Sequence, residues 1–180
     1  TGDERFLEKI RACVEGLARC QRGDGYVFAS PEEIFDRVEQ KQPAWVPWYT
    51  MHKILSGLIS VCRYVHDAAA LNVAVKLGGW ISRRVLAWSE ETKAIVLAVE
   101  YGGMNDCLYD LYDLTGDETF FKAAHQFDEI PLFKAMEENR DILNGLHANT
   151  TIPKIIGALK RYVVSDETDA LYITAAKNFW

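Results

Sequence analysis

The chain has 180 residues, of which 49% are hydrophobic and 26% are charged, and its formal net charge is −6. This composition is typical of a folded globular domain and excludes a disordered chain, which combines low hydrophobicity with high net charge. The acidic balance argues against a nucleic-acid partner, because no basic face is available to neutralise phosphates. No apolar run approaches the roughly 20 residues of a membrane-spanning helix, so no membrane partner is expected either.

The four cysteines stand at positions 13, 20, 62 and 107, and none forms a C-x-x-C pair. We therefore expect buried apolar thiols, with no metal site and no secreted disulfide framework. No signal peptide is visible. The compartment stays open, with the cytoplasm favoured over a secreted location.

A signature that ends one helix and begins the next recurs at intervals of about 50 residues. It reads Thr-Gly-Asp-Glu at 1–4 and 115–118 and Ser-Asp-Glu-Thr at 165–168, and a weaker copy stands at 66–67. Glycine suits the left-handed turn after a helix, and aspartate caps the following helix through its side-chain oxygen. The predicted capping residues are Asp3, Asp67, Asp117 and Asp166.

Two kinds of helix alternate along the chain. In chain order the expected helices are 5–19, 54–65, 71–86, a short one at 90–98, 104–114, one after Asp117, 152–164 and one after Asp166. Those that precede a signature are apolar over much of their circumference, which indicates inner helices, and those that follow it are amphipathic, which indicates outer helices. The segment 30–47 contains three of the five prolines and is predicted to be irregular.

This pattern predicts an all-α fold, an α/α toroid of helical hairpins of the (α/α)6-barrel type. The hairpins account for about half of a ring. We expect residues 1–180 to be a single partial catalytic domain with no internal boundary. The uncovered flanks predict either a homo-oligomer or a missing remainder of the toroid.

Three polar segments, 45–53, 100–106 and 145–150, lead into the three inner helices. Parallel inner helices would bring these segments together at one end of the fold. Tyrosine and tryptophan rings stack on sugar rings, polar side chains satisfy hydroxyl groups, and glycine allows close backbone approach. The segments therefore predict a carbohydrate pocket, with oligosaccharide or polysaccharide as the partner. Its candidate substrate-binding residues are Trp48, Tyr49, His52, Glu100, Gly102, Gly103, Asn105, Asp106, His147, Asn149 and Thr150.

Several of these candidates also have a simpler interpretation, and Glu100 in particular could be a solvated loop acid. His52 and His147 could be histidines bonded to backbone, Asp106 could be a helix cap, and Gly102 with Gly103 could form only a turn. Glu100 and Asp106 are the one acidic pair in these segments that could act as a catalytic couple, although hydrogen bonding to substrate is favoured. The alternative functions are another sugar-active toroid, either an epimerase or an unsaturated uronyl hydrolase, and a non-enzymatic helical-repeat module with a peptide groove.

Segments 48–54, 100–106 and 146–154 together resemble the motifs of the β-L-arabinofuranosidase glycoside hydrolases, family 127, formerly a family of unknown function. Segments 21–26 and 178–180 also match that family's usual sequence. The resemblance implies a retaining glycosidase that acts on non-reducing-end L-arabinofuranosides. It also implies an (α/α)6 toroid followed by β-sandwich domains, with this chain as the N-terminal part of the toroid.

The resemblance further implies a cysteine nucleophile, held near a zinc ion by a glutamate and other cysteines, and a second glutamate as acid/base. Those motifs lie downstream and have no counterpart in residues 1–180. We therefore expect no cofactor here, one wall of the sugar pocket, and no activity from this segment alone. The sequence departs from the family at Asp106, where glutamate is expected, and at Thr151, where glutamine is common.

Overall fold

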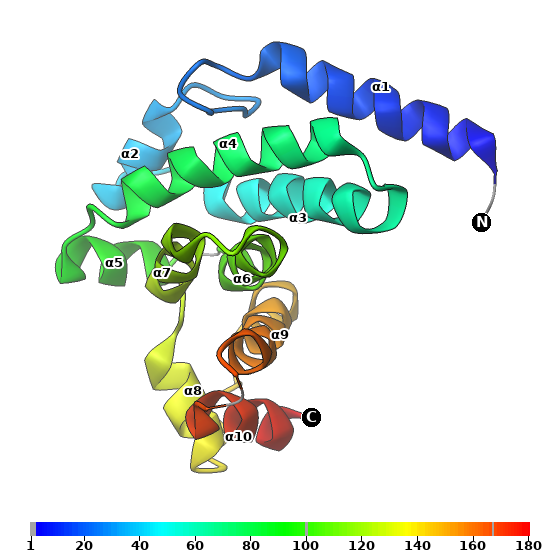
Figure 1. The fold of residues 1–180 in the computed structure, drawn as a ribbon. Helices are drawn as coiled ribbons and strands as arrows, with labels where there is room; N and C mark the ends of the chain where they lie inside the picture. Colours follow the sequence, from blue (N-terminus) through cyan, green and yellow to red (C-terminus); the bar gives the residue numbers. More distant parts are fainter. Residues whose placement is uncertain (1–2, 100, 167) are drawn as a thin grey trace.

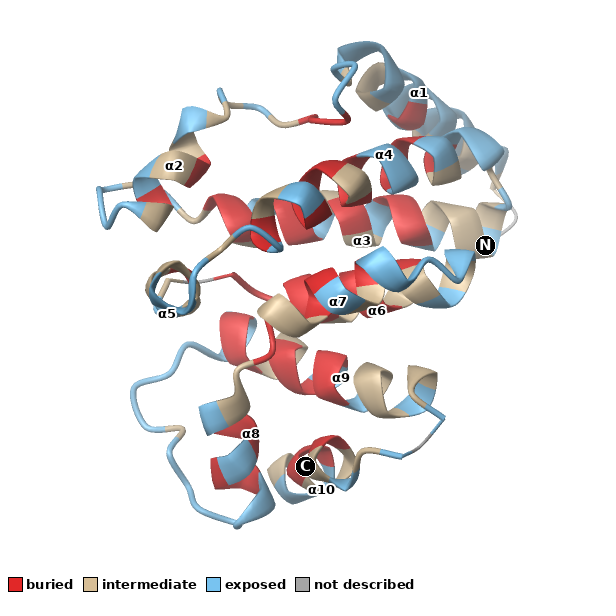
Figure 2. Ribbon diagram, turned by 60° about the vertical axis from the view of Figure 1, so that its left-hand side comes forward, coloured by how far each residue is buried: buried red, intermediate tan, exposed pale blue. Residues whose placement is uncertain are grey.

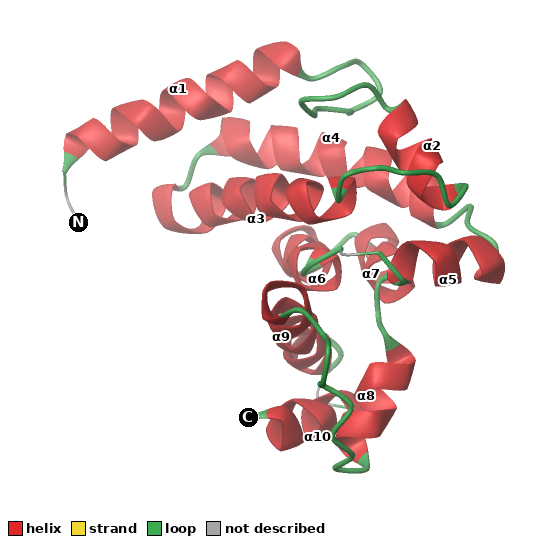
Figure 3. Ribbon diagram, turned by 180° about the vertical axis from the view of Figure 1, so that it is seen from behind, coloured by secondary structure: helices red, strands yellow, loops and turns green. Residues whose placement is uncertain are grey.

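The computed structural model describes residues 3–99, 101–166 and 168–180. Regular secondary structure in these ranges is entirely helical (Figure 3), which confirms the predicted all-α class. The helices are α1 (Glu4–Cys20), α2 (Glu33–Glu39), α3 (Pro47–Val65), α4 (Ala68–Val85), α5 (Glu90–Leu97), α6 (Met104–Thr115), α7 (Glu118–Gln126), α8 (Ile130–Glu137), α9 (Ala148–Val164) and α10 (Ala170–Phe179). None of them is both long and apolar enough to cross a lipid bilayer.

The repeat unit has three helices instead of the predicted two. The predicted inner helices are α3, α6 and α9, the outer ones are α1, α4, α7 and α10, and the short helix is α5. Two further short helices, α2 and α8, occupy the same place as α5, between an outer helix and the next inner helix. The sequence did not predict either one, because α2 lies within the proline-containing segment 30–47 that was expected to be irregular, and α8 has a proline as its second residue and no side-chain cap.

Three of the four predicted caps are confirmed. The Asp3 carboxylate accepts a hydrogen bond from the backbone of Arg5, and Asp67 and Asp117 cap α4 and α7 in the same way. Gly116 takes the expected left-handed turn after α6, with a φ of 70°. The fourth cap is wrong, because α10 begins later than expected and Asp169 occupies its N-cap position without a side-chain cap bond.

The inner helices run parallel, as their contacts show. Near their starts, the Gly103 backbone N–H donates to His52 Nδ1 at 3.2 Å, and a Cβ on Gly103 would meet Pro153 Cβ at 2.9 Å. Toward their far ends, Asp110 of α6 pairs with Arg63 of α3 at 3.0 Å and with Lys160 of α9 at 2.6 Å. Starts therefore meet starts, and ends meet ends. Figure 1 shows α4 beside α3 and α7 beside α6, which is the expected pairing of outer with inner helices.

The core has two buried clusters. The larger runs from α1 through α7 and centres on aromatic side chains such as Phe35, Trp48 and Phe127. The smaller joins α8, α9 and α10, and includes Phe133 and Tyr172. In Figure 2 the buried residues follow the inward faces of α3, α4 and α6, and a second group lies on α8, α9 and α10.

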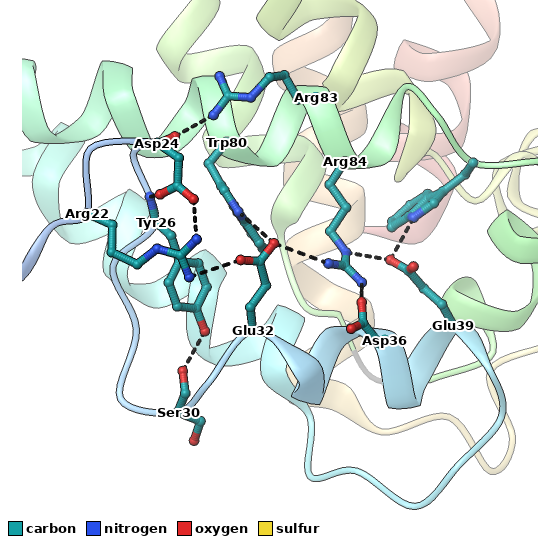
Figure 4. A network of polar contacts seen from close by, with 11 residues as sticks. Arg22, Asp24, Tyr26, Ser30, Glu32, Asp36, Glu39, Trp80, Arg83 and Arg84 are labelled. Atoms are coloured by element: carbon teal, nitrogen blue, oxygen red, sulfur yellow. Dashed lines mark hydrogen bonds and ion pairs between the residues drawn. The ribbon is translucent and has the colours of Figure 1, made fainter.

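Polar contacts fix the segment between α1 and α3 onto α4 (Figure 4). Arg84 of α4 is only 14% exposed and pairs with Asp36 and with Glu39, the latter at 2.7 Å. Trp80 Nε1 donates to Glu32 at 3.1 Å, and Trp88 Nε1 donates to Glu39 at 2.8 Å. These contacts hold α2 against α4 and so position the segment that leads into α3.

Candidate functional site

His52 lies at the junction between α3 and α6. It is 4% exposed, its Nδ1 accepts the Gly103 backbone N–H, and the Tyr49 ring stands edge-on at 5.8 Å between ring centroids. Burial, and next the charge of Lys53, lower the pKa of His52 to about 4. The ring is therefore neutral near pH 7. Because Nδ1 is an acceptor, the ring proton sits on Nε2, which can donate a hydrogen bond.

Gly102 and Gly103 allow this close approach. A Cβ on Gly102 would lie 2.6 Å from His52 Nδ1 and 2.8 Å from Tyr49, and Gly102 has a left-handed φ of 62°. A Cβ on Gly103 would lie 3.0 Å from His52 Nε2 as well as against Pro153. Both glycines thus let the start of α6 pack between α3 and α9. The predicted approach of this backbone to a ligand stays a prediction.

Trp48 is enclosed within the core. Its indole is 1% exposed and is surrounded by Phe35, Trp88 and Phe127, with centroid separations of 4.7, 5.5 and 5.2 Å. No face of this ring is open to stack on a sugar in this structure, which corrects the expectation for Trp48. Trp45, three positions earlier and not among the candidates, is instead 84% exposed.

Asn105 uses its amide inside the protein. Its Nδ2 donates to Asp128 Oδ1 and to the Lys154 carbonyl, both at 3.2 Å, and its Oδ1 accepts the Asp106 backbone N–H at 2.9 Å. The side chain is fully buried. Asn105 is therefore unable to contact a sugar directly in this structure, because its amide nitrogen and oxygen are already hydrogen-bonded within the protein.

Asp106 is half-buried in the first turn of α6. The N-cap position belongs to Gly103, so Asp106 is not the cap that the simpler interpretation suggested. Burial and then the neighbouring Asp110 raise the pKa of Asp106 to about 6, against the opposing charges of Lys160 and Arg63. This carboxyl can take up or release a proton near neutral pH.

The third polar segment begins α9. His147 is its N-cap residue, with Nδ1 accepting the Asn149 backbone N–H at 3.2 Å, and both side chains are exposed. Thr150 is buried and its hydroxyl donates to the His147 carbonyl at 3.0 Å. Glu100 lies outside the described residues. The direct contacts therefore join Tyr49, His52 and the glycine pair, and His147 with Asn149 forms a separate exposed corner at the start of α9.

The described thiols do not resemble a catalytic or metal-binding set. Contrary to the sequence prediction, Cys13 and Cys20 are exposed on α1 and Cys62 is half-buried, so only Cys107 is buried. Burial raises the pKa of both Cys62 and Cys107, which disfavours the thiolate form. Within the described ranges no three His, Cys, Asp or Glu side chains are grouped to hold a metal ion. The described residues therefore do not fit the zinc site that the family resemblance implies.

Parallel inner helices backed by outer helices, with polar side chains at the inner starts, define an all-helical protein of the α/α-toroid class. A protein-family model described as "Beta-L-arabinofuranosidase, GH127 catalytic domain" matches residues 1–180. The chain therefore belongs to this family of glycoside hydrolases, as its motifs predicted, and the family acts on carbohydrate. None of the curated proteins that were compared matches the chain.

Proposed function

We propose that these residues form one wall of the sugar pocket of a glycosidase that acts on non-reducing-end L-arabinofuranosides. Family membership supports the glycosidase class. The observation that carries the pocket is the contact of Gly103 with both His52 and Pro153, because it brings the polar residues in the first turns of α3 and those before α6 to the same end as the start of α9.

The proposed roles follow from the chemistry of each group. The Nε2–H of His52 donates to a sugar hydroxyl, and Asp106 accepts from one. Tyr49 offers a partly exposed ring to the C–H face of the sugar. His147 and Asn149 supply exposed polar groups at the α9 corner. The shorter side chain of Asp106 leaves more room than the glutamate usual in the family.

We do not assign cleavage of the glycosidic bond to these residues. Retaining hydrolysis needs a nucleophile and an acid/base at a fixed separation across the scissile bond. We infer from the family resemblance that both, together with zinc, belong to motifs that residues 1–180 do not contain. We therefore expect this 180-residue chain to bind the sugar without hydrolysing it.

A titration of the ¹⁵N-labelled chain with methyl β-L-arabinofuranoside tests the proposal. The backbone amides of Gly102, Gly103 and Asn149 should shift on binding, and His147→Ala should weaken binding by about tenfold, the loss of one good hydrogen bond. His66→Asn is the matched control, because His66 lies at the opposite end of α3 in a left-handed conformation that asparagine tolerates. Absence of shifts in the unmodified chain would refute the sugar pocket.

A second candidate function rests on an apolar groove between α1 and α3. This groove, about 370 Å³ in volume, is lined by side chains such as Phe6, Ile10, Ile54 and Val61. It is the kind of feature that the peptide-binding alternative predicts. Family membership favours the glycosidase. The same titration separates the two functions, since a peptide-binding module would leave Gly103 and Asn149 unaffected by the sugar.

A further inference from the structure

Two consecutive acids, Asp128 and Glu129, lie in the connection between α7 and α8, outside the three motif-bearing segments. They stand between the two buried clusters of the core. Most of their polar contacts are with segments far away along the chain: Asp128 contacts α6 and α10, and Glu129 contacts α9 and the segment before α6.

Asp128 is the acceptor at the centre of a buried group of donors. Its side chain is fully buried, and Oδ1 accepts from the Asn105 amide at 3.2 Å. Oδ2 accepts from the hydroxyls of Tyr109 at 2.6 Å and Tyr172 at 2.8 Å, and lies 3.1 Å from His125 Nδ1. A buried carboxylate with this many donors is held rigidly, because every lost contact would leave charge unsatisfied.

Glu129 makes an equivalent set of contacts one residue later. Its Oε2 lies 2.6 Å from Lys154 Nζ and accepts the Tyr101 hydroxyl at 3.2 Å. The Lys154 ammonium also lies over the Tyr101 ring, 4.3 Å from the centroid. Tyr101 is fully buried and the Lys154 side chain is 10% exposed, so the lysine is shielded from solvent, whereas the Glu129 side chain is 26% exposed.

Both sets lead directly to the proposed sugar site. Asn105, held by Asp128, accepts the backbone N–H of Asp106. Tyr101, held by Glu129, precedes the glycine pair that contacts His52, and Lys154 follows the proline that packs on Gly103. The two acids therefore set the position of the α6 start relative to the α9 start.

We infer that Asp128 and Glu129 are positioning residues, which hold the segments before α6 and in α9 in the geometry required for sugar binding. Neither acid is assigned a contact with the sugar. The inference rests on the proposed function for its binding readout only, because the geometry of the glycine pair is measurable without any ligand.

Substitutions that remove charge but keep shape test this role in the full 180-residue chain. Glu129→Gln should shift the amide resonances of Gly102 and Gly103 in the ligand-free protein, and should weaken binding of methyl β-L-arabinofuranoside by about tenfold. Lys154→Arg should retain the wild-type resonances, since it keeps the ion pair. Glu137→Gln is the matched control, because Glu137 is an exposed acid on α8 and loses the same charge.

A milder variant keeps the test valid if Glu129→Gln folds poorly. Tyr101→Phe removes one hydrogen bond to Glu129 and leaves the ring beneath Lys154, so it should shift the same two amides by a smaller amount. The positioning role is overturned if Gly102 and Gly103 keep their wild-type resonances in both variants. It is also overturned if Glu137→Gln shifts them equally. If the wild-type chain binds no sugar while the resonances shift as expected, the proposed function fails and the positioning role stands.

Discussion

Folding shifts the pKa values of His52 and Asp106, which lie at the same end of the fold, in opposite directions. The pKa of His52 falls to about 4, so between pH 4 and 6.5 the unfolded chain binds a proton that the folded chain does not, and stability rises with pH. The pKa of Asp106 rises to about 6, so between pH 3.8 and 6 the folded chain keeps a proton that the unfolded chain has released, and stability falls with pH. The two effects oppose each other in the window they share.

Replacing one of these two residues should leave the pH effect of the other measurable. Asp106→Asn should make the free energy of unfolding rise more steeply with pH than in the wild type between about pH 4.5 and 6, because only the His52 effect remains. The full His52 contribution is on the order of 3 kcal/mol. In His52→Gln only the Asp106 effect of the two remains, so the free energy of unfolding should fall as pH rises over the same window. Urea denaturation of the three proteins at several pH values measures these slopes, and parallel curves would contradict the shifts.

At the scale of the helices, glycines decide how closely α6 and α9 approach. A Cβ at Gly157 of α9 would overlap the Asn105 amide, which cannot move because Asp128 and the Lys154 carbonyl hold it. A Cβ at Gly57 of α3, in contrast, would meet no neighbouring atom within 4 Å. The two glycines look alike in the sequence, since both lie inside inner helices.

Alanine at these two positions should have opposite effects. Gly157→Ala should destabilise the fold by about 1–3 kcal/mol through overpacking. Gly57→Ala should stabilise it by about 0.5–1 kcal/mol, because alanine restricts the unfolded chain and favours the helix. Chemical denaturation of both variants checks the signs. Equal effects would show that α6 and α9 are not packed as closely as described.

Helix caps give a second prediction at this scale. Asp67→Ala should cost about 1 kcal/mol, because its carboxylate accepts two backbone N–H groups at the start of α4, at 2.8 and 3.0 Å. Asp169→Ala should cost clearly less, since the Asp169 side chain makes no cap bond with α10. Thermal unfolding of the two variants compares them directly, and a larger loss for Asp169→Ala would be the contrary result.

At the scale of the molecule, apolar surface is exposed at both ends of the helical arc. The groove between α1 and α3 includes Phe6, which is 57% exposed. On α9, Ile156, Leu159 and Val163 are 44%, 40% and 55% exposed and follow one another at helical spacing. Exposed apolar patches of this kind promote association.

We therefore expect the 180-residue chain to self-associate as its concentration rises. Val163→Glu should reduce this association by placing a charge within the α9 stripe. Val75→Glu on α4 is the control, since Val75 is also exposed but lies apart from both surfaces. Light scattering across a concentration series measures the mass, and a wild-type chain that stays monomeric throughout would exclude the effect.

Local sequence patterns were sufficient for the long helices and for the alternation of inner and outer helices. Apolar periodicity and Asp-led starts act within a few residues, so the long helices and three caps could be predicted. The short helices α2 and α8 could not, because contacts with α3, α5 and α10 stabilise them more than their own sequence does.

The sequence by itself determined the helical class, the alternation of inner and outer helices and the family. Only the tertiary structure decided which polar and aromatic residues remain free to meet a ligand. Trp48 is enclosed by Phe127, and Asn105 is bonded to Asp128, 23 positions away in the chain. Burial depends on such distant partners, because packing between helices decides what surrounds a side chain. The periodicity of apolar residues within one helix does not contain this information.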